Sequence, residues 1–356
     1  MGKIQIKSPF KFLDSYQHED KQIFFGREQE TLELYNRIFE TNLVLLYGAS
    51  GTGKTSLINC GLSNEFEPGD WLPIFIRRRD NILESWKMEL HRFANKKLKE
   101  DASFSEMIRS VYLDFFKPIY LVFDQFEELF ILGSKEEQTL FFNELEQLLR
   151  ANLQCKIIIS MREEYLAHLS EYEHIVPDLF DNRIRVEKMN SKNLKDVVMK
   201  TIAAFDIEME SPNEVADMIV NKLRDKNHQV DLATLQVYLD QLYRMDAERR
   251  GNENRPIKFD KALVEKTGNL ENIMGSFLDE QLRTLERELQ EDKNIKEKGI
   301  PLDILFALVT DNGTKQAVEL EDLKNQLRRS KKIDGDVVDY CINRFKEMRI
   351  LRELSE

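Results

Sequence analysis

The feature that most constrains the fold is an eight-residue stretch, Gly48 to Thr55, which reads Gly-Ala-Ser-Gly-Thr-Gly-Lys-Thr. It fits the pattern G-x-x-x-x-G-K-[ST]. The apolar run Leu43 to Tyr47 precedes it, and Thr55 to Ile58 opens a helix-forming segment. A glycine-rich turn between a buried strand and a helix lets backbone N–H groups surround phosphate oxygens at the positive end of the helix dipole. The stretch therefore predicts a phosphate-binding loop within an α/β fold.

The residue types of this loop predict separate tasks at the phosphates of a nucleoside triphosphate. Lys54 is expected to bridge the outer phosphates, and the hydroxyl of Thr55 is expected to ligate Mg²⁺. The residues expected to contact the nucleotide in this region are Gly48, Ser50, Gly51, Thr52, Gly53, Lys54, Thr55 and Ser56. The alternative is a glycine-rich turn without a ligand, which the strand-loop-helix context disfavours.

Short β-branched runs alternate with helix-forming stretches in the first half of the chain, as in a parallel sheet flanked by helices. Several runs are apolar almost throughout, which is typical of strands buried on both faces. The predicted strands are Leu43 to Tyr47, Leu72 to Ile76, Ile119 to Asp124, Lys156 to Met161 and Arg183 to Glu187. Helices are predicted between them at Ser56 to Leu62, Leu83 to Leu98 and Glu136 to Leu149.

A phosphate loop needs a carboxylate on its metal side, at the end of a neighbouring strand. The run Ile119 to Asp124, five apolar residues and then an acid, has this Walker B form. Asp124 is expected to hold Mg²⁺ through Thr55 and water. Glu127 is the first candidate to orient an attacking water and Glu128 the second, with a capping or solvated role as the alternative for either. Gln125 occupies the position where motor-type ATPases carry a catalytic acid.

Several arginines could either contact the nucleotide or lie on the surface. Arg162 follows the predicted strand Lys156 to Met161, where its guanidinium fork could reach a γ-phosphate and report its presence. The alternative is a salt bridge to Glu163 or to another acid. The runs Arg77 to Arg79 and Arg328 to Lys332 are each interpreted as a solvated face or a contact for an acidic partner, because neither belongs to a wider basic stripe.

Composition and charge narrow the class of protein. The 356 residues are enough for two or three domains, and the formal net charge of −12 argues against wholesale nucleic-acid binding. The three cysteines are far apart and match no metal-ligand spacing. No apolar run reaches the roughly 20 residues of a membrane-spanning helix, and the first residues lack the apolar segment of a signal peptide. We expect a cytoplasmic protein that uses neither a membrane nor nucleic acid.

The second half of the chain has a different character. Strand signals fade after Lys188, and apolar residues recur at helical spacing after Ser211 and after Asp231. A long amphipathic helix is predicted from Leu270. We therefore place the main domain boundary near Lys188.

Together these motifs resemble the STAND class of signal-transduction ATPases, in particular the bacterial novel STAND subgroup, which is related to AAA+ proteins within the P-loop NTPase superfamily. The most specific parts are the string Phe24-Phe25-Gly26-Arg27-Glu28 and the string Asp124-Gln125-Phe126-Glu127-Glu128. The resemblance also includes Ser8 to Lys11, the phosphate loop, Met161-Arg162 and Leu235 to Leu239, so it covers most of the chain.

The resemblance implies ATP and ADP as ligands, an adenine pocket near Phe25, Gly26 and Arg27, and a sensor role for Arg162. It implies a P-loop nucleotide-binding domain at residues 1–188, an α-helical lid at 189–268, and a winged-helix-like module at 269–356 that we expect to be incomplete. The lid stretch Asp231 to Gln236 lacks the proline that many relatives place against the nucleotide, so it predicts no particular lid contact.

Proteins of this class act as switches that are closed with ADP at rest and self-associate with ATP when a ligand is sensed, and many bacterial members are thought to act in antiviral defence or regulated cell death. We expect an ATP/ADP-dependent switch reset by slow Mg-dependent hydrolysis, with sensor and effector modules outside this chain. Two alternatives stay open. Gln125 disfavours an ATP-driven motor or remodelling ATPase, and the acids of Asp334 to Met348 disfavour a DNA-binding initiator-type ATPase.

Overall fold

The computed structural model describes residues 8–11, 14–95, 98–99, 101–224, 229–251, 253, 255–267, 270–292, 295, 297–310, 316, 318–347 and 350–351. The chain divides into two compact units. The sheet unit consists of Ser15–Leu232 and Asn252–Asp260, and the helical unit consists of Met1–Asp14, Ala233–Gly251 and Lys261–Glu356. The division into three parts at residues 188 and 268 stays a prediction.

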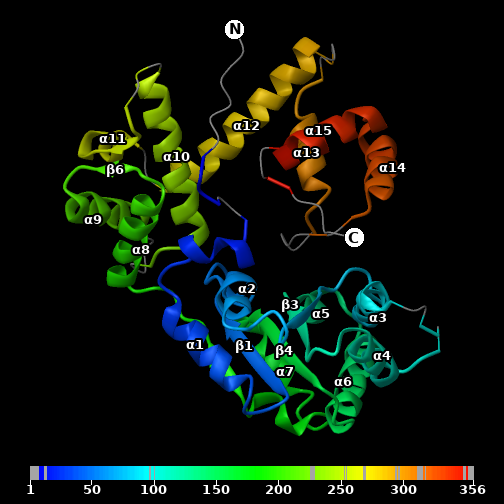
Figure 1. Cartoon of the computed structure of the whole chain (residues 1–356). Helices are drawn as coiled ribbons and strands as arrows, with labels where there is room; N and C mark the ends of the chain where they lie inside the picture. The colour runs from blue at the N-terminus through cyan, green and yellow to red at the C-terminus, as the bar shows by residue number, and fades with distance from the viewer. Residues whose placement is uncertain are drawn as a thin grey trace. The chain divides into compact units, whose positions relative to one another are not determined.

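The sheet unit is built on a five-stranded parallel sheet with the strand order β2-β3-β4-β1-β5 among the described residues. Figure 1 labels β1, β3 and β4 of this sheet. The strands are β1 (Leu43–Gly48), β2 (Leu72–Ile76), β3 (Ile119–Asp124), β4 (Cys155–Arg162) and β5 (Arg183–Arg185). The predicted α/β class and parallel sheet are confirmed. Of the five predicted strands, β2 and β3 have the predicted bounds, β1 is one residue longer at its end, β4 is one residue longer at each end, and β5 ends two residues early.

Helices precede, connect and follow these strands, and some of them cover the two faces of the sheet. They are α1 (Glu28–Arg37), α2 (Lys54–Ser56), α3 (Ile82–Phe93), α4 (Phe104–Phe115), α5 (Glu128–Leu132), α6 (Lys135–Arg150), α7 (Leu166–Ser170), α8 (Ser191–Ala204) and α9 (Pro212–Leu223). After α2 the chain continues through a π-helical turn, Leu57–Gly61, and a 3₁₀ turn, Leu62–Asn64. A short parallel pair joins β6 (Glu208–Met209) to β7 (Lys258–Phe259). The helix predicted for Leu83 to Leu98 ends at Phe93, so its last turn is wrong.

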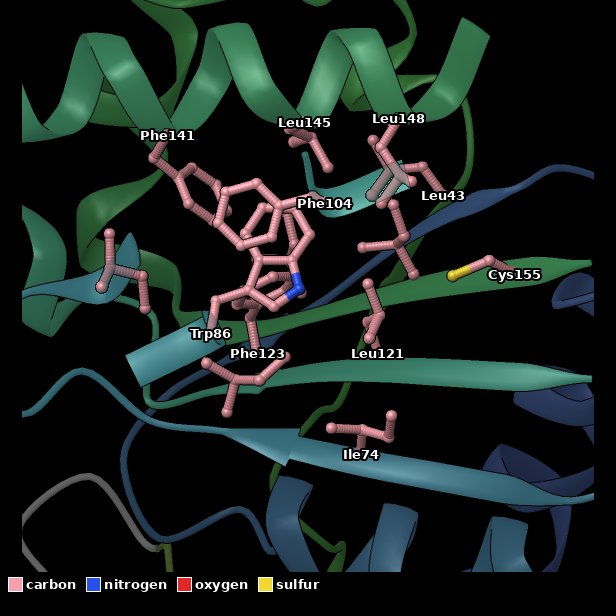
Figure 2. Close-up of a cluster of buried hydrophobic side chains, with 14 of the residues drawn as sticks. Leu43, Ile74, Trp86, Phe104, Leu121, Phe123, Phe141, Leu145, Leu148 and Cys155 are labelled. Atoms are coloured by element: carbon pink, nitrogen blue, oxygen red, sulfur yellow. The ribbon is translucent and has the colours of Figure 1, made fainter. Parts of the chain in front are cut away.

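The two faces of the sheet bury alternate residues of each strand, as the two-residue period of a strand requires. On one face Leu121 and Phe123 pack against α3, α4 and α6, and Trp86 of α3 is fully buried there. Figure 2 shows the Trp86 ring among Phe104, Phe123 and Phe141; its centroid lies 3.9 Å from that of Phe104 and 5.1 Å from that of Phe123. These aromatic contacts fix α3 and α4 on the sheet.

The opposite face carries the elements that lead to the phosphate loop. Val122 of β3 and Leu46 of β1 pack there against Leu34 of α1 and against Leu57 and Ile58, which follow the loop. All of these side chains are buried. The sheet therefore holds the segment after the loop by hydrophobic contact, while β1 fixes the start of the loop by strand pairing.

The helical unit has a core of its own. Its helices are α10 (Leu232–Arg250), which begins at the last residue of the first sheet-unit segment, α11 (Lys261–Lys266), α12 (Leu270–Asp292), α13 (Ile300–Phe306), α14 (Leu320–Lys331) and α15 (Gly335–Glu347). Residues of the last four helices meet in one cluster: Leu285, Leu289, Ile300, Ile304, Leu323, Leu327, Val338, Cys341, Ile342 and Phe345. The predicted helical character of this region is confirmed, and its winged-helix form stays a prediction. No helix among the described residues is long and apolar enough to cross a membrane.

Candidate nucleotide site

The phosphate loop begins where β1 ends and turns through two glycines with positive φ, Gly51 at +74° and Gly53 at +87°. These φ values favour glycine because a side chain there would strain the backbone. Gly48 is required for space, since a Cβ at this position would lie 2.3 Å from the carbonyl oxygen of Val186. Inside the loop, Thr52 Oγ1 donates to the carbonyl oxygen of Ala49 over 3.0 Å. The turn is thus fixed by its own hydrogen bonds and by β1.

Lys54 opens the helix after the loop, and its ammonium group turns back across the loop. Its Nζ donates to the carbonyl oxygens of Gly48 over 2.8 Å and Ala49 over 3.0 Å. Burial lowers the pKa of Lys54, and the nearby carboxylates of Glu127 and Asp124 oppose this effect. The positive charge therefore lies inside the curve of the loop, where phosphate oxygens would complete its coordination.

The predicted metal-side pair, Thr55 and Asp124, is brought together at the carboxyl end of β3. Thr55 Oγ1 lies 3.1 Å from each carboxylate oxygen of Asp124. Asp124 is buried, with 4% of its side chain exposed, and it forms an ion pair with Arg77. Arg77 Nε donates to Asp124 Oδ2 over 3.1 Å, and Nη2 donates to the same oxygen.

The run Arg77 to Arg79 is not a solvated face, and that interpretation is wrong. Each arginine pairs with an acid of this chain: Arg77 with Asp124, Arg78 with Glu137 and Arg79 with Glu89. The Arg78–Glu137 pair is buried on both sides. Arg328 and Lys331 of the second run lie on an exposed face of the helical unit, where they pair with Asp334 and Asp303.

Glu127 and Arg162 form a clamp at the end of β4. Glu127 Oε1 lies 3.1 Å from Arg162 Nε, and Glu127 Oε2 accepts the backbone N–H of Arg162 over 3.2 Å. Glu127 is buried, whereas the Arg162 side chain is 44% exposed. The salt-bridge alternative for Arg162 therefore applies with Glu127 as the acid, and the exposed guanidinium can still approach a ligand. The sensor role of Arg162 and the water-orienting role of Glu127 stay predictions.

Glu128 begins α5, and its carboxyl group has a perturbed pKa. Burial, and after it the negative charge of Glu127, raises the pKa of Glu128 from 4.5 to about 7. Gln125, between Asp124 and this helix, has φ +58°, which is uncommon for a residue with a side chain and marks a strained turn. This turn directs Glu127 toward β4 and leaves Glu128 beside Glu127.

The segment predicted to border the adenine lies against α8 and the phosphate loop. Arg27 is buried, and its Nη2 donates over 2.8 Å to the carbonyl oxygen of Thr52 and over 2.8 Å to that of Glu187. Gly26 has φ +81°, and a Cβ there would meet Val197 at 2.5 Å. Lys200 of α8 lies 5.8 Å from the centre of the Phe25 ring. Arg27 thus fastens the phosphate loop to the segment after β5.

Ser56 turns toward a neighbouring segment of the sheet unit. Its Oγ accepts the backbone N–H of Tyr16 over 3.1 Å. Ser50 lies exposed in the loop, while Thr52 is buried. Every residue predicted around the phosphates thus lies in or next to one loop, although their contacts with a nucleotide stay predictions.

Sequence reasoning missed several neighbours of this site. Asp231 approaches the loop so closely that a Cβ on Gly51 would lie 1.8 Å from its Oδ2, and Leu232 approaches Gly53. Ser160 is the β4 residue paired in register with Asp124, and its buried Oγ has no hydrogen-bond partner among the described residues. The β4 register was the only available signal for Ser160, and the only signal for Asp231 was that the family resemblance places the stretch Asp231 to Gln236 in a lid.

These groups fit a nucleotide with Mg²⁺. The loop presents an ammonium group and glycine backbone to an anion, and Thr55 and Asp124 offer the hydroxyl and single carboxylate that suit Mg²⁺ when phosphates and water supply the other ligands. Among the described residues, no group of three or more His, Cys, Asp and Glu side chains could hold a metal by itself.

A parallel sheet with a phosphate loop after β1 and an acid at the end of β3 defines the P-loop NTPase class. Solved structures agree with this class. The ORC2 protein of Aeropyrum pernix in its ADP form has a TM-score of 0.53 at 12% identity, covering 96% of this chain and 100% of that chain. The same protein in ADPNP-ADP complexes has a TM-score of 0.52 at 11% identity, covering 92% and 86%. At these identities the likeness concerns the fold alone.

A third structure, a Walker-type ATPase of Pyrococcus abyssi, has a TM-score of 0.48 at 17% identity and covers 94% of this chain and 91% of that chain. No curated protein matches the sequence. The sequence model of the family Novel STAND NTPase 1 matches residues 9–353. The chain therefore belongs to the novel STAND NTPase family, and it is a nucleotide-binding P-loop NTPase of the STAND type.

Proposed function

We propose that this protein is an ATP/ADP-dependent switch that hydrolyses ATP slowly with Mg²⁺ and is reset by that hydrolysis. The observation that carries the proposal is the Thr55 hydroxyl 3.1 Å from both carboxylate oxygens of Asp124, directly after the phosphate loop. This pair offers the metal one carboxylate and one hydroxyl, as expected for Mg²⁺ held against nucleotide phosphates. Membership of the STAND family supports the signalling role.

Slow turnover is supported by the state of two acids near the loop. Asp124 is paired with Arg77, and Glu127 is paired with Arg162. A general base must be free to accept a proton, and these pairings leave neither carboxylate free in the nucleotide-free protein. The pKa of Glu128, raised to about 7, lies in the range that suits a general base at neutral pH, so Glu128 stays a candidate to act on the water.

The residues divide the work of hydrolysis in a definite way. Lys54 neutralises charge on the outer phosphates, and Thr55 and Asp124 hold Mg²⁺, which when bound neutralises the charge that develops on the phosphates. Glu127 positions Arg162 through two contacts, so the Arg162 guanidinium reaches the γ-phosphate from the end of β4. Glu127 or Glu128 orients the attacking water, and mutation separates these two assignments.

Adenine nucleotides are the proposed ligands, and the segment Phe25 to Arg27 is the proposed border of the adenine. The A. pernix ORC2 structures, which are described with ADP and ADPNP, support this choice by fold only. The proposed cellular role is a cytoplasmic switch that self-associates with ATP and acts with sensor and effector modules in antiviral defence or cell death. A DNA-binding initiator role is not favoured, because the net charge is −12 and α15 carries Asp336 and Asp339.

Measurement of single-turnover and steady-state ATP hydrolysis on one preparation tests this proposal. A switch should bind Mg·ATP and Mg·ADP at micromolar concentration or tighter, hydrolyse the bound ATP slowly, and shift to a larger assembly with a non-hydrolysable ATP analogue. Sustained rapid turnover with no change of assembly between ATP analogue and ADP would favour a motor. Failure to bind either nucleotide would contradict the proposal as a whole.

A further inference from the structure

Asp124, the proposed metal-side carboxylate, is already paired with a cation of the chain. Arg77 approaches it with two guanidinium nitrogens, both aimed at Oδ2, and Nε lies 3.1 Å from that oxygen. Asp124 is 4% exposed and Arg77 is 23% exposed. A buried carboxylate is strongly stabilised by one paired cation, and a guanidinium pair of this kind is a strong charge-assisted contact. The Arg77–Asp124 pair therefore opposes any second cation at the same group.

The fold places Arg77 at this position. Strands β2 and β3 are neighbours, and Ile76, the last residue of β2, is in register with Phe123. Arg77 follows Ile76 and Asp124 follows Phe123, so the two residues lie side by side at the carboxyl end of the sheet. The backbone of Arg77 is fixed by β2, whereas its side chain is long and partly exposed.

We propose that Arg77 is a built-in counter-cation of the metal site, which occupies Asp124 until Mg²⁺ arrives with nucleotide and which must then withdraw from it. The inference rests on the proposed Mg-nucleotide function of this site. Arg77 stabilises the buried charge of Asp124 in the nucleotide-free protein. It also lowers the affinity of the site for Mg²⁺, because Mg²⁺ can bind Asp124 only when the contacts between Arg77 and Asp124 are lost.

The loop after Arg77 is fastened, so the exchange is a rotation of one side chain. Glu137 Oε1 accepts the backbone N–H of Ile82 over 2.7 Å and Arg78 Nε over 3.0 Å, while its Oε2 accepts Arg78 Nη2 over 2.9 Å. Arg78 Nη2 also donates to the carbonyl oxygen of Asp80. These contacts tie residues 78–82 to the first turn of α6. Arg77 is the arginine of the run whose partner belongs to the metal site.

The test compares ADP affinity, measured by calorimetry in EDTA and in saturating Mg²⁺, between the wild type and Arg77→Met. Methionine keeps the length of the side chain and removes its charge. In Mg²⁺, Arg77→Met should bind ADP about 10-fold more tightly than the wild type, the low end of the value of a charge-assisted contact. In EDTA, the two affinities should agree within about 3-fold, because the metal-free complex does not compete for Asp124.

Two further variants make the comparison specific. Arg79→Met removes the third arginine of the same run, which pairs with Glu89 of α3, and its affinities should match the wild type. Arg77→Lys keeps the charge and loses the fork, so its affinity in Mg²⁺ should lie between those of the wild type and Arg77→Met. Arg77→Lys also provides the answer if Arg77→Met does not fold.

The inference is overturned if Arg77→Met, or Arg77→Lys in its place, binds Mg·ADP as tightly as the wild type or more weakly. Weaker binding would mean that Arg77 contacts the phosphates in the loaded site. Wild-type protein that binds no ADP, or that binds ADP with the same affinity in Mg²⁺ and in EDTA, would contradict the proposed function itself. Failure of the proposed function is therefore distinguishable from failure of the inference about Arg77. Thermal unfolding supplies a second readout: the rise in Tm on addition of Mg·ADP should be larger in Arg77→Met, whose nucleotide-free form leaves Asp124 buried without its cation.

Discussion

Replacing Asp124 by asparagine should weaken both the fold and the response to Mg²⁺. The side chain is 4% exposed, accepts Thr55 Oγ1 at both oxygens, and accepts two nitrogens of Arg77 at one. Asparagine has the same shape but no charge, and its amide group is a donor that faces other donors. The exchange removes a charge-assisted contact worth roughly 1.5 to 3 kcal/mol.

The loss of stability should therefore be about 2 to 3 kcal/mol in the nucleotide-free protein, because Arg77 is partly exposed and can regain water. Urea unfolding measures this difference, and calorimetry of ADP with and without Mg²⁺ measures the metal response, which should disappear. Asp80→Asn is the matched control, since Asp80 is an exposed acid in the loop after β2. A stability within about 0.5 kcal/mol of the wild type, together with an intact Mg²⁺ response, would refute the account of this carboxylate.

Three other substitutions test separate parts of the molecule. Glu127→Gln breaks the ion pair with Arg162 and should still bind Mg·ATP but hydrolyse it more slowly in single-turnover assays. Wild-type hydrolysis rates in both this variant and Glu128→Gln would mean that neither residue positions the water. The pKa of Glu128 is raised from 4.5 to about 7, so between these pH values the folded wild type holds a proton that the unfolded chain loses. Its stability relative to Glu128→Gln should therefore fall as pH rises from 4.5 to about 7. An unfolding free energy that changes with pH in parallel for the two proteins would contradict that pKa. Trp86→Ala should cost about 3 to 5 kcal/mol in urea unfolding, against less than about 0.5 for the exposed Met88→Ala, and equal losses would contradict the core of Figure 2.

Local patterns were enough to predict the sheet and the phosphate loop. Strands β1, β3 and β4 are apolar runs buried on both faces, a pattern that can be recognised in sequence, and the loop lies between a strand and a helix as its pattern requires. The helix predicted to continue to Leu98 fails for a reason outside that pattern. Ala94 is extended, and the N–H of Asn95 donates to the carboxylate of Asp114 over 2.8 Å, so a contact with α4 replaces another helical turn.

The parts of the site that sequence could not predict depend on which strands are neighbours. Arg77 follows β2 and looks like one member of a basic run until β2 is paired with β3, which places it beside Asp124. Asp231 is separated from the phosphate loop by most of the sheet unit, and only the fold brings it to Gly51. Residue types thus indicated the ligand, whereas long-range pairing determined which charges surround it.

Calorimetric titration of Mg·ADP and Mg·ATP into wild-type protein and Lys54→Ala tests the central claim most directly. Lys54 Nζ lies 2.8 Å from the carbonyl oxygen of Gly48, inside the curve of the loop, so its removal should weaken both nucleotides by about 10 to 150-fold, the value of one charge-assisted phosphate contact. Lys135→Ala, which removes an exposed lysine of α6, is the control and should bind as the wild type does. The account predicts micromolar or tighter binding in the wild type and a loss confined to Lys54→Ala, and an unchanged affinity in Lys54→Ala would contradict it.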